Sequence, residues 1–383
     1  MPRIVAFAVH AVDLPFRLKF EHAAASRSLS ESLFIELKLD DGTIGWGESL
    51  PRPYVTGEVR DGACELLATH ILPHLLDRSF ASFDEVVAFL SDCNGKAPAH
   101  WVSPQMPHCA AWCAVDLALL DAFGKHFGKP PLGPATLRRD LRYSGVVSSG
   151  KDWKHRAQLL AYRLLGFREL KLKIDASTTA NDIAKIHRVA GNRIHLRADV
   201  NMGWDVSQAL NLMPALARHG VQSFEQPLTA SDFGGAARLL RDTGLDVMAD
   251  ESFSTADSLT SLINMRSCTA INARISKCGG LVATLARCRE AKAAGLFVQI
   301  GCQVGESSLL SSAHLHLCAA FPAVRHAEGC FGTLLLAEDP ASPMLRFGRG
   351  GKPPRIPSGP GLGIKIDRAC LERHRSGHWS GDA

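Results

Sequence analysis

The sequence predicts an α/β protein, in which a closed barrel of eight parallel strands is covered at one end by an α+β domain. Two observations lead to this fold class. From about residue 140 onward, short apolar or β-branched segments alternate with helical patterns, which is typical of a parallel sheet. Residues at the ends of these segments, polar except for Gly301, also recur at intervals of 24 to 27 positions, the length of one strand plus one helix.

Eight segments have the composition of barrel strands, at residues 142–149, 169–175, 193–200, 221–227, 246–252, 269–276, 296–302 and 323–329. The segments between them, such as 152–167 and 281–295, carry apolar residues at i, i+3 and i+4 and a glycine near the end, as amphipathic helices do. Eight strands in about 200 residues favour a closed barrel over residues 136–340. A doubly wound open sheet is the alternative.

The first 135 residues have a different pattern. Residues 32–49 alternate apolar and polar side chains on either side of Asp40-Asp41-Gly42, which predicts an antiparallel hairpin. Residues 63–76 and 83–93 are predicted helices. The segment 341–383 is rich in proline and glycine, so we expect it to run over the surface and complete the N-terminal domain, 1–135.

Composition excludes several classes of protein. The chain is 46% hydrophobic and 21% charged, and its net charge of +5 is not gathered into a basic run, so a nucleic-acid partner is not expected. The N-terminus lacks the pattern of a secretory leader, and the eleven cysteines are scattered through apolar segments. We therefore expect reduced thiols, a cytoplasmic location and no membrane association.

A zinc site is the alternative interpretation of Cys109 and Cys113 beside His108. No second Cys or His pair at ligand spacing lies near this segment in the sequence. The surrounding segment 109–123 instead has the pattern of a buried amphipathic helix.

Three successive predicted strands end in carboxylates, Asp199, Glu225 and Asp250. Because the C-terminal ends of barrel strands meet at one mouth, we expect these side chains to converge. An all-oxygen set suits a hard cation such as Mg²⁺. The alternative is that each is a solvated loop acid.

Lys171 and Lys173 stand two positions apart on one predicted strand, so both side chains face the same side. Burial, a second cation and a nearby metal can lower the pKa of a lysine from ~10.4 toward ~7–8, where it can act as a base. Together with the three acids, this pair suggests removal of the α-proton of a metal-bound carboxylate substrate. An outward, solvated lysine pair is the alternative.

Several stretches of the sequence form a recognisable set. They are residues 114–132, LKLKID (170–175), RADVNMGW (197–204), FEQP (224–227), ADES (249–252) and NARISKCGG (272–280). Together they resemble the enolase superfamily, and within it the muconate lactonizing enzyme subgroup. The resemblance implies a modified TIM barrel, (β/α)7β, with an α+β capping domain. It also implies a homo-oligomer, since relatives are commonly assembled in that way.

The resemblance implies roles for individual residues. Lys173 corresponds to the base and Lys171 to its electrostatic partner. The three acids correspond to ligands of Mg²⁺, for which Mn²⁺ is a possible substitute, and Asn201 would support this metal site. Glu328, at the end of the eighth predicted strand, resembles a glutamate of muconate cycloisomerases, although it could be a simple loop acid.

Arg274 is a departure from the family pattern, which has its second catalytic lysine at this position. Arginine stays protonated in almost any protein, so it is a poor base and a good fixed cation. One-sided chemistry is therefore expected, either cycloisomerisation or syn β-elimination. Racemisation or epimerisation of N-acyl amino acids or dipeptides is the alternative, with Lys277 as a possible replacement base. A catalytically silent binding protein and a zinc hydrolase are alternatives from other classes.

Two segments of the first domain resemble the loops that choose the substrate in this family, 20–27 and 45–58. They make His22, Arg27, Arg52 and Tyr54 candidate substrate contacts. Two arginines weakly suggest a second anionic group on the substrate, and each residue could equally be an ordinary surface residue.

Overall fold

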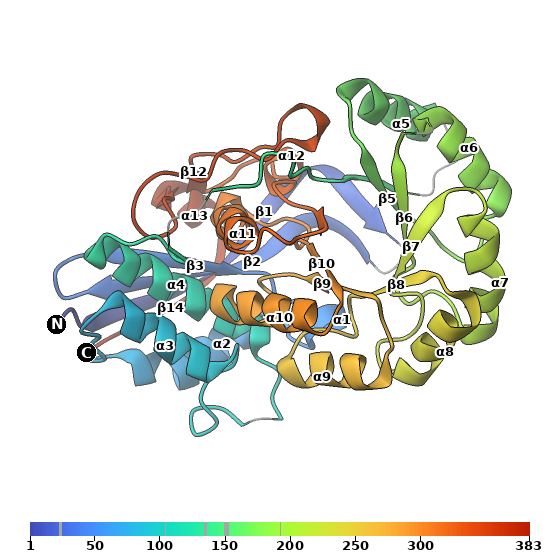
Figure 1. Cartoon of the computed structure of the whole chain (residues 1–383). Helices are drawn as coiled ribbons and strands as arrows, with labels where there is room; N and C mark the ends of the chain where they lie inside the picture. Colours follow the sequence, from blue (N-terminus) through green and yellow to red (C-terminus); the bar gives the residue numbers. More distant parts are fainter. Residues whose placement is uncertain (23–24, 104, 134–135, 149–152, 192) are drawn as a thin grey trace.

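The computed structural model describes residues 1–22, 25–103, 105–133, 136–148, 153–191 and 193–383. The side chains of residues 18–27, 148, 154 and 333 lie outside the description. Two sheets dominate this part of the chain, one in a barrel and one in a cap (Figure 1). None of the described helices is both long enough and apolar enough to span a membrane.

The barrel sheet has eight strands in the order β11-β10-β9-β8-β7-β6-β5-β4, and all its neighbouring strands are parallel. Their bounds are β4 Gly145–Ser148, β5 Glu169–Lys173, β6 His195–Asp199, β7 Val221–Glu225, β8 Asp246–Ala249, β9 Ala270–Ala273, β10 Phe297–Ile300 and β11 His326–Ala327. All eight predicted strands are confirmed. A parallel bridge between Tyr143 and Ala327 joins the two edge strands, so the sheet closes on itself instead of staying open.

Seven helices connect these strands in the described part of the chain, which confirms the predicted (β/α)7β order. They are α5 Trp153–Leu165, α6 Ala180–Ala190, α7 Val206–Ala217, α8 Phe233–Thr243, α9 Ala256–Met265, α10 Leu281–Ala293 and α11 Ser308–Ala320. Capping boxes at Thr179, Asp205 and Thr255 begin α6, α7 and α9, because their side chains satisfy backbone N–H groups of the first turn.

The cap is an antiparallel sheet in the order β14-β1-β2-β3, with helices packed against it. Its strands are β1 Ile4–His22, β2 Ala25–Leu39, β3 Ile44–Ser49 and β14 Arg375–Asp382. Its helical segments are α1 Pro53–Thr56, α2 Arg60–Leu66, a π-helical turn Leu67–Ile71, a 3-10 turn Leu72–Leu75, α3 Phe83–Cys93 and α4 Cys109–Phe127. The predicted hairpin is β2–β3, and Gly42 turns it with a φ of 85°.

The C-terminal segment crosses back from the barrel to the cap. It contains α12 Gly332–Leu335, β12 Ala341–Ser342, a 3-10 turn Arg349–Gly351, β13 Lys365–Ile366 and α13 Arg368–His374 before β14. β14 pairs with β1, so the last strand of the chain is an edge of the N-terminal sheet. The exact domain boundaries stay predictions.

The buried helix predicted over residues 109–123 is confirmed as α4, but its amphipathic character is wrong, because α4 is buried on all sides from Cys109 to Gly124. It packs against β3 on one side and against α3 and α10 on others. Gly47 permits the close approach of β3, since a Cβ there would lie 1.9 Å from the carbonyl oxygen of Ala114. Cys109 and Cys113 are buried free thiols, and no metal-ligand group among the described residues includes them.

A buried carboxylate of the cap accepts hydrogen bonds from the first turn of a barrel helix. Glu48 of β3 accepts hydrogen bonds from the backbone N–H of Ser307 at 2.9 Å and of Leu310 at 3.1 Å, at the start of α11. Burial raises the pKa of Glu48 to about 8, against the effect of these hydrogen bonds. The cap is therefore fixed to the barrel beside the loop that follows β10.

Candidate active site

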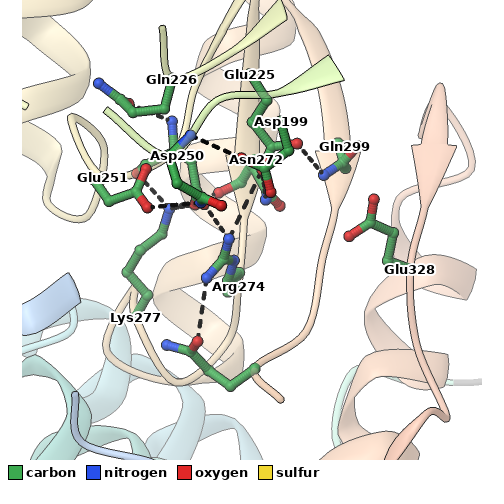
Figure 2. A network of polar contacts seen from close by, with 12 residues as sticks. Asp199, Glu225, Gln226, Asp250, Glu251, Asn272, Arg274, Lys277, Gln299 and Glu328 are labelled. Carbon is green, nitrogen blue, oxygen red and sulfur yellow. Dashed lines mark hydrogen bonds and ion pairs between the residues drawn. The ribbon is translucent and has the colours of Figure 1, made fainter. Parts of the chain in front are cut away.

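The predicted carboxylates lie at the C-terminal ends of neighbouring barrel strands (Figure 2). Asp199 ends β6, Glu225 ends β7, and Asp250 follows β8 directly. Asp199 pairs in register with Lys173 on one side and with Glu225 on the other. The strand register brings these groups to one level of the barrel mouth.

Lys171 is a buried cation among three acids. Its Nζ lies 3.0 Å from Asp199 Oδ2, 2.9 Å from Glu225 Oε1 and 3.4 Å from Glu328 Oε2. Burial alone would lower the pKa of Lys171, but the three carboxylates outweigh it and hold the pKa well above its ordinary value. Lys171 is therefore a fixed positive charge and not a base.

Lys173 has the opposite tendency. It is the last residue of β5, and its pKa is lowered, first by burial and then by the positive charges of Lys171 and Arg274. Asp199 opposes this shift without cancelling it. Of the two lysines, Lys173 is the one whose surroundings favour a neutral, proton-accepting amine.

The three carboxylates fit a hard divalent cation by their chemistry. Asp199, Glu225 and Asp250 are at most 2% exposed and offer only oxygen donors, as Mg²⁺ prefers. Burial raises the pKa of Glu225 to about 7, the ammonium of Lys171 works against this, and Asp199 and Asp250 add to the rise. This crowding of negative charge is the setting in which a bound dication is stabilised.

Protein cations lie between these acids. The three ligand oxygens do not gather within 4.8 Å of one another among the described residues. Lys171 bridges Asp199 and Glu225, and the guanidinium of Arg274 forms an ion pair with Asp250 Oδ2 and lies 3.8 Å from Glu225 Oε1. A metal ion at this position would have to share or displace these cations.

Arg274 is held by acceptors on both sides. Besides its contact with Asp250, its Nη1 donates to Gln303 Oε1 at 3.2 Å. Burial would lower the pKa of Arg274, but Asp250 and Glu225 raise it further above its already high value. Arg274 therefore stays protonated and cannot accept a proton from a substrate.

Lys277, the possible replacement base, is held by acceptors of the protein. Its Nζ donates to Asp250 Oδ1 at 2.7 Å, to the carbonyl oxygen of Asp250 at 2.7 Å and to the carbonyl oxygen of Asn272 at 2.9 Å. An ammonium group has three donors, so all of them are engaged by the protein. The geometry assigns Lys277 to holding Asp250 in place.

Glu328 lies at the end of β11 and is turned toward two cations. Its Oε1 accepts from Arg197 at 3.1 Å, and its Oε2 accepts from Lys171 at 3.4 Å. Burial would raise its pKa, but Lys171 and Arg197 outweigh this and lower it. Glu328 is therefore an ionised member of the same charged network and not a solvated loop acid.

Asn201 and Gln226 fix the loops that carry the acids, with left-handed backbones at φ 47° and 41°. The backbone N–H of Asn201 donates to Asp199 Oδ1 at 3.3 Å, and its side chain donates to Glu251 at 3.4 Å. Gln226 Oε1 accepts from the backbone N–H of Asp250 at 2.9 Å. Gln226 and Glu251 were not among the predicted site residues.

Three further polar residues, which lie within the barrel strands just before the strand ends, were not predicted from the sequence. Asn272 donates to Glu225 Oε1 at 2.8 Å, Gln299 donates to Glu225 Oε2 at 3.5 Å, and Arg197 contacts Gln299. Each of these three stands two positions before a residue that the spacing had selected. Because side chains two apart share a face, stepping back two positions along each strand would have found them.

The substrate contacts expected from the cap stay predictions, and the structure describes two of the four side chains. Arg52 is only 2% exposed, and its Nη1 donates to the carbonyl oxygens of Glu31 and Pro51, each at 3.0 Å, so it supports the loop around it. Tyr54 is exposed in α1. The side chains of His22 and Arg27 lie outside the described residues.

Comparison with known proteins places the chain in a family. The model of the enolase C-terminal domain-like family matches residues 154–370, more than half of the chain. The chain belongs to the enolase superfamily.

Among relatives in this superfamily, the N-succinyl-L-Arg/Lys racemase of Bacillus cereus is 25% identical over 97% of both chains. The L-Ala-D/L-Glu epimerase of Bacillus subtilis is 28% identical over 97% of this chain and 98% of its own. Muconate cycloisomerase 1 of Rhodococcus opacus is 28% identical over 96% and 97%. All three are isomerases by name.

Solved structures agree with this chain in fold. That of the Bacillus cereus racemase superposes with a TM-score of 0.87 at 23% identity, covering 99% of this chain and 100% of that one. A dipeptide epimerase from Cytophaga hutchinsonii, complexed with Mg and the dipeptide D-Ala-L-Val, gives 0.85 at 21% identity over 99% of each chain. The predicted barrel and cap are therefore confirmed at the level of the fold.

Proposed function

We propose that this protein is a Mg²⁺-dependent isomerase or lyase that removes the α-proton of a carboxylate substrate, with Lys173 as the base. The observation that carries the proposal is one barrel mouth in which Lys173, with a lowered pKa, lies beside the fixed cation Lys171 and three buried carboxylates. Asp199, Glu225 and Asp250 would hold the metal. When bound, Mg²⁺ supplies positive charge opposite the second negative charge that develops on the substrate carboxylate.

The side chains of the protein divide the remaining work. Lys173 takes the α-proton and can return it to the same face of the substrate. Lys171 stays charged, and its positive charge helps to lower the pKa of Lys173. Arg274, also permanently charged, offers a guanidinium that can donate hydrogen bonds to the anionic intermediate but cannot remove a proton.

One active base favours a reaction that proceeds on a single face, namely cycloisomerisation or syn β-elimination. In both reactions one lysine can serve every proton transfer, so a second base on the opposite face is not required. The similarity to muconate cycloisomerase 1, at 28% identity over 96% of this chain, supports this candidate.

A racemase or epimerase of N-acyl amino acids or dipeptides is the second candidate. The comparisons favour it, because an N-succinyl amino acid racemase and an L-Ala-D/L-Glu epimerase match nearly the whole chain. Chemically it requires a proton donor and acceptor on the face opposite Lys173, where this chain has Arg274 instead of lysine.

Proton exchange in deuterated water tests the proposal and separates the candidates. Unsaturated diacids, N-succinyl amino acids and dipeptides, the last two as separate stereoisomers, are incubated with the enzyme with and without Mg²⁺. Mass spectrometry then measures deuterium, and chiral chromatography measures configuration. A one-base enzyme exchanges the α-proton of one stereoisomer with retention, or forms a cyclised or eliminated product.

A racemase gives both configurations, each labelled. The matched control is Lys173→Ala, which must lose exchange while keeping the fold. Wild-type rates in this variant would overturn the assignment of Lys173, and a lack of exchange with every substrate class would favour a catalytically silent binding protein.

A further inference from the structure

Three side chains of metal-binding type lie together away from the barrel mouth. Cys370 and His374 are four positions apart on α13, and Glu338 lies between α12 and β12, in the segment that crosses over to the cap (Figure 1). Residues four apart on a helix share a face. The ligand atoms of all three lie within 4.8 Å of one another, and no other such group occurs among the described residues.

Two of the three distances in this group match a tetrahedral metal centre, and the third, between Cys370 Sγ and the ligand nitrogen of His374, is within 4.8 Å. Cys370 Sγ lies 3.6 Å from Glu338 Oε2, and His374 Nε2 lies 3.3 Å from the same oxygen. Around tetrahedral zinc, with Zn–S near 2.3 Å and Zn–N and Zn–O near 2.1 Å, the corresponding separations are about 3.6 Å for S···O and about 3.4 Å for N···O. We propose that Cys370, His374 and Glu338 form a zinc site, with water as the fourth ligand.

The types of ligand select the metal. Thiolate and imidazole are softer donors than carboxylate and suit Zn²⁺, whereas Mg²⁺ prefers oxygen alone. The proposed site is therefore chemically distinct from the carboxylates of the barrel mouth. From a mixture of Zn²⁺ and Mg²⁺, the Cys370 site should therefore bind Zn²⁺ and the carboxylates of the barrel mouth should bind Mg²⁺.

Arg373 competes for the same carboxylate. Its guanidinium lies 2.7 Å from Glu338 Oε2, the oxygen that Cys370 and His374 also contact. Among the described residues, the three side chains that contact Glu338 all do so at Oε2. The guanidinium of Arg373 can therefore turn to Oε1 when a metal binds Oε2. The side chain of Arg373 is 55% exposed, which leaves it room for this movement.

Metal binding at this site must release a proton. Burial, with Glu338 close by, raises the pKa of the Cys370 thiol to about 11, and a thiol binds zinc as the thiolate. Affinity should therefore fall as the pH is lowered, by about tenfold for each unit as long as His374 stays neutral. Since α13 runs directly into β14, bound zinc would tie the last strand of the cap to the segment after α12.

Full-length protein, stripped with a chelator and then saturated with Mg²⁺ to occupy the carboxylates of the barrel, tests the proposal. Titration with Co²⁺ should produce a thiolate-to-metal absorption band, and Zn²⁺ should abolish it at one equivalent. Cys370→Ser should remove the band, and His374→Ala should weaken Zn²⁺ binding at least tenfold. Arg373→Ala should tighten it several-fold, because the competing cation is gone.

Cys64→Ser is the matched control, since Cys64 is another buried free thiol of the cap, and it should bind both metals as the wild type does. Circular dichroism checks that every variant is folded. The proposal is overturned if the wild type shows no thiolate band. It is equally overturned if Cys370→Ser binds Zn²⁺ as tightly as the wild type, or if Arg373→Ala binds it more weakly. Active-site turnover does not enter these readouts, so failure here leaves the proposed function untouched.

Discussion

Replacing Arg274 with methionine should tighten the binding of Mg²⁺ at least tenfold. The guanidinium pairs with Asp250 and lies 3.8 Å from Glu225 Oε1, so it stands between two of the proposed ligands. A unit charge and a dication about 4 Å apart repel by about 8 kcal/mol at an effective dielectric constant of about 20. Arg274 can relieve much of this repulsion by moving away, but even a sixth of it, about 1.4 kcal/mol, corresponds to a factor of ten.

Isothermal titration of chelator-treated protein with Mg²⁺ measures this change without any substrate. Arg197→Met is the matched control. It also removes a buried guanidinium of the barrel, but Arg197 contacts Glu328 and Gln299 instead of the three proposed ligands. Unchanged or weaker Mg²⁺ binding by Arg274→Met would refute the reasoning. An equal gain in Arg197→Met would show that total charge, and not displacement from Asp250, controls affinity.

Three further predictions concern chemistry and stability. Lys173→Ala should lower the rate of α-proton exchange by about 10²–10⁴, the usual contribution of a general base, as measured by mass spectrometry in deuterated water. Burial lowers the pKa of His316 from 6.5 to about 4, so the folded protein resists protonation that the unfolded chain accepts. Stability from this residue is complete above pH 6.5 and is lost as the pH falls toward 4, by up to about 3 kcal/mol. Urea unfolding at pH 7 and pH 4.5 should therefore show a smaller loss for His316→Leu than for the wild type, and an equal loss would contradict the assignment. Gly47→Ala should destabilise the protein by about 1–3 kcal/mol, because the new Cβ would meet Ala114 at 1.9 Å. Gly62→Ala, where a Cβ meets nothing within 4 Å, should be neutral or stabilising by comparison.

The barrel could be predicted because its spacing is regular. Each strand and helix together occupy 24 to 27 positions, so one residue per repeat, polar in every case but Gly301, marks the strand ends from Lys173 to Glu328. Parallel pairing then fixes their relative heights, as the register of Lys173, Asp199 and Glu225 shows. The position of the backbone at the mouth thus follows from the sequence pattern alone.

The cap was less predictable because its packing depends on contacts far apart in the sequence. The pattern of α4 is that of a helix with a polar face, yet Asp116 and Asp121 are buried. Asp116 accepts from the backbone N–H of Leu281 at 2.6 Å, and Asp121 accepts from that of Trp46 at 2.9 Å. These acids satisfy backbone groups of the barrel and of β3. The charges of Asp116 and Asp121 suggest an exposed face of the helix, but in the fold both side chains lie in the interior.

The pairing of charges at the mouth could not be predicted from the sequence. Most of the charged residues involved were expected there, but Arg197 and Glu251 were missed. Arg274 was expected as a fixed cation on the face opposite Lys173, but its partner is Asp250, which Lys277 holds from the other side. Side-chain length decides this, because the guanidinium at the end of β9 reaches the neighbouring acid after β8. A lysine at position 274 would present a single ammonium instead of a planar fork. Compared with the lysine that the family pattern has at this position, Arg274 changes the proposed chemistry in two ways. It cannot act as a base, and it places a permanent cation beside the proposed metal ligands.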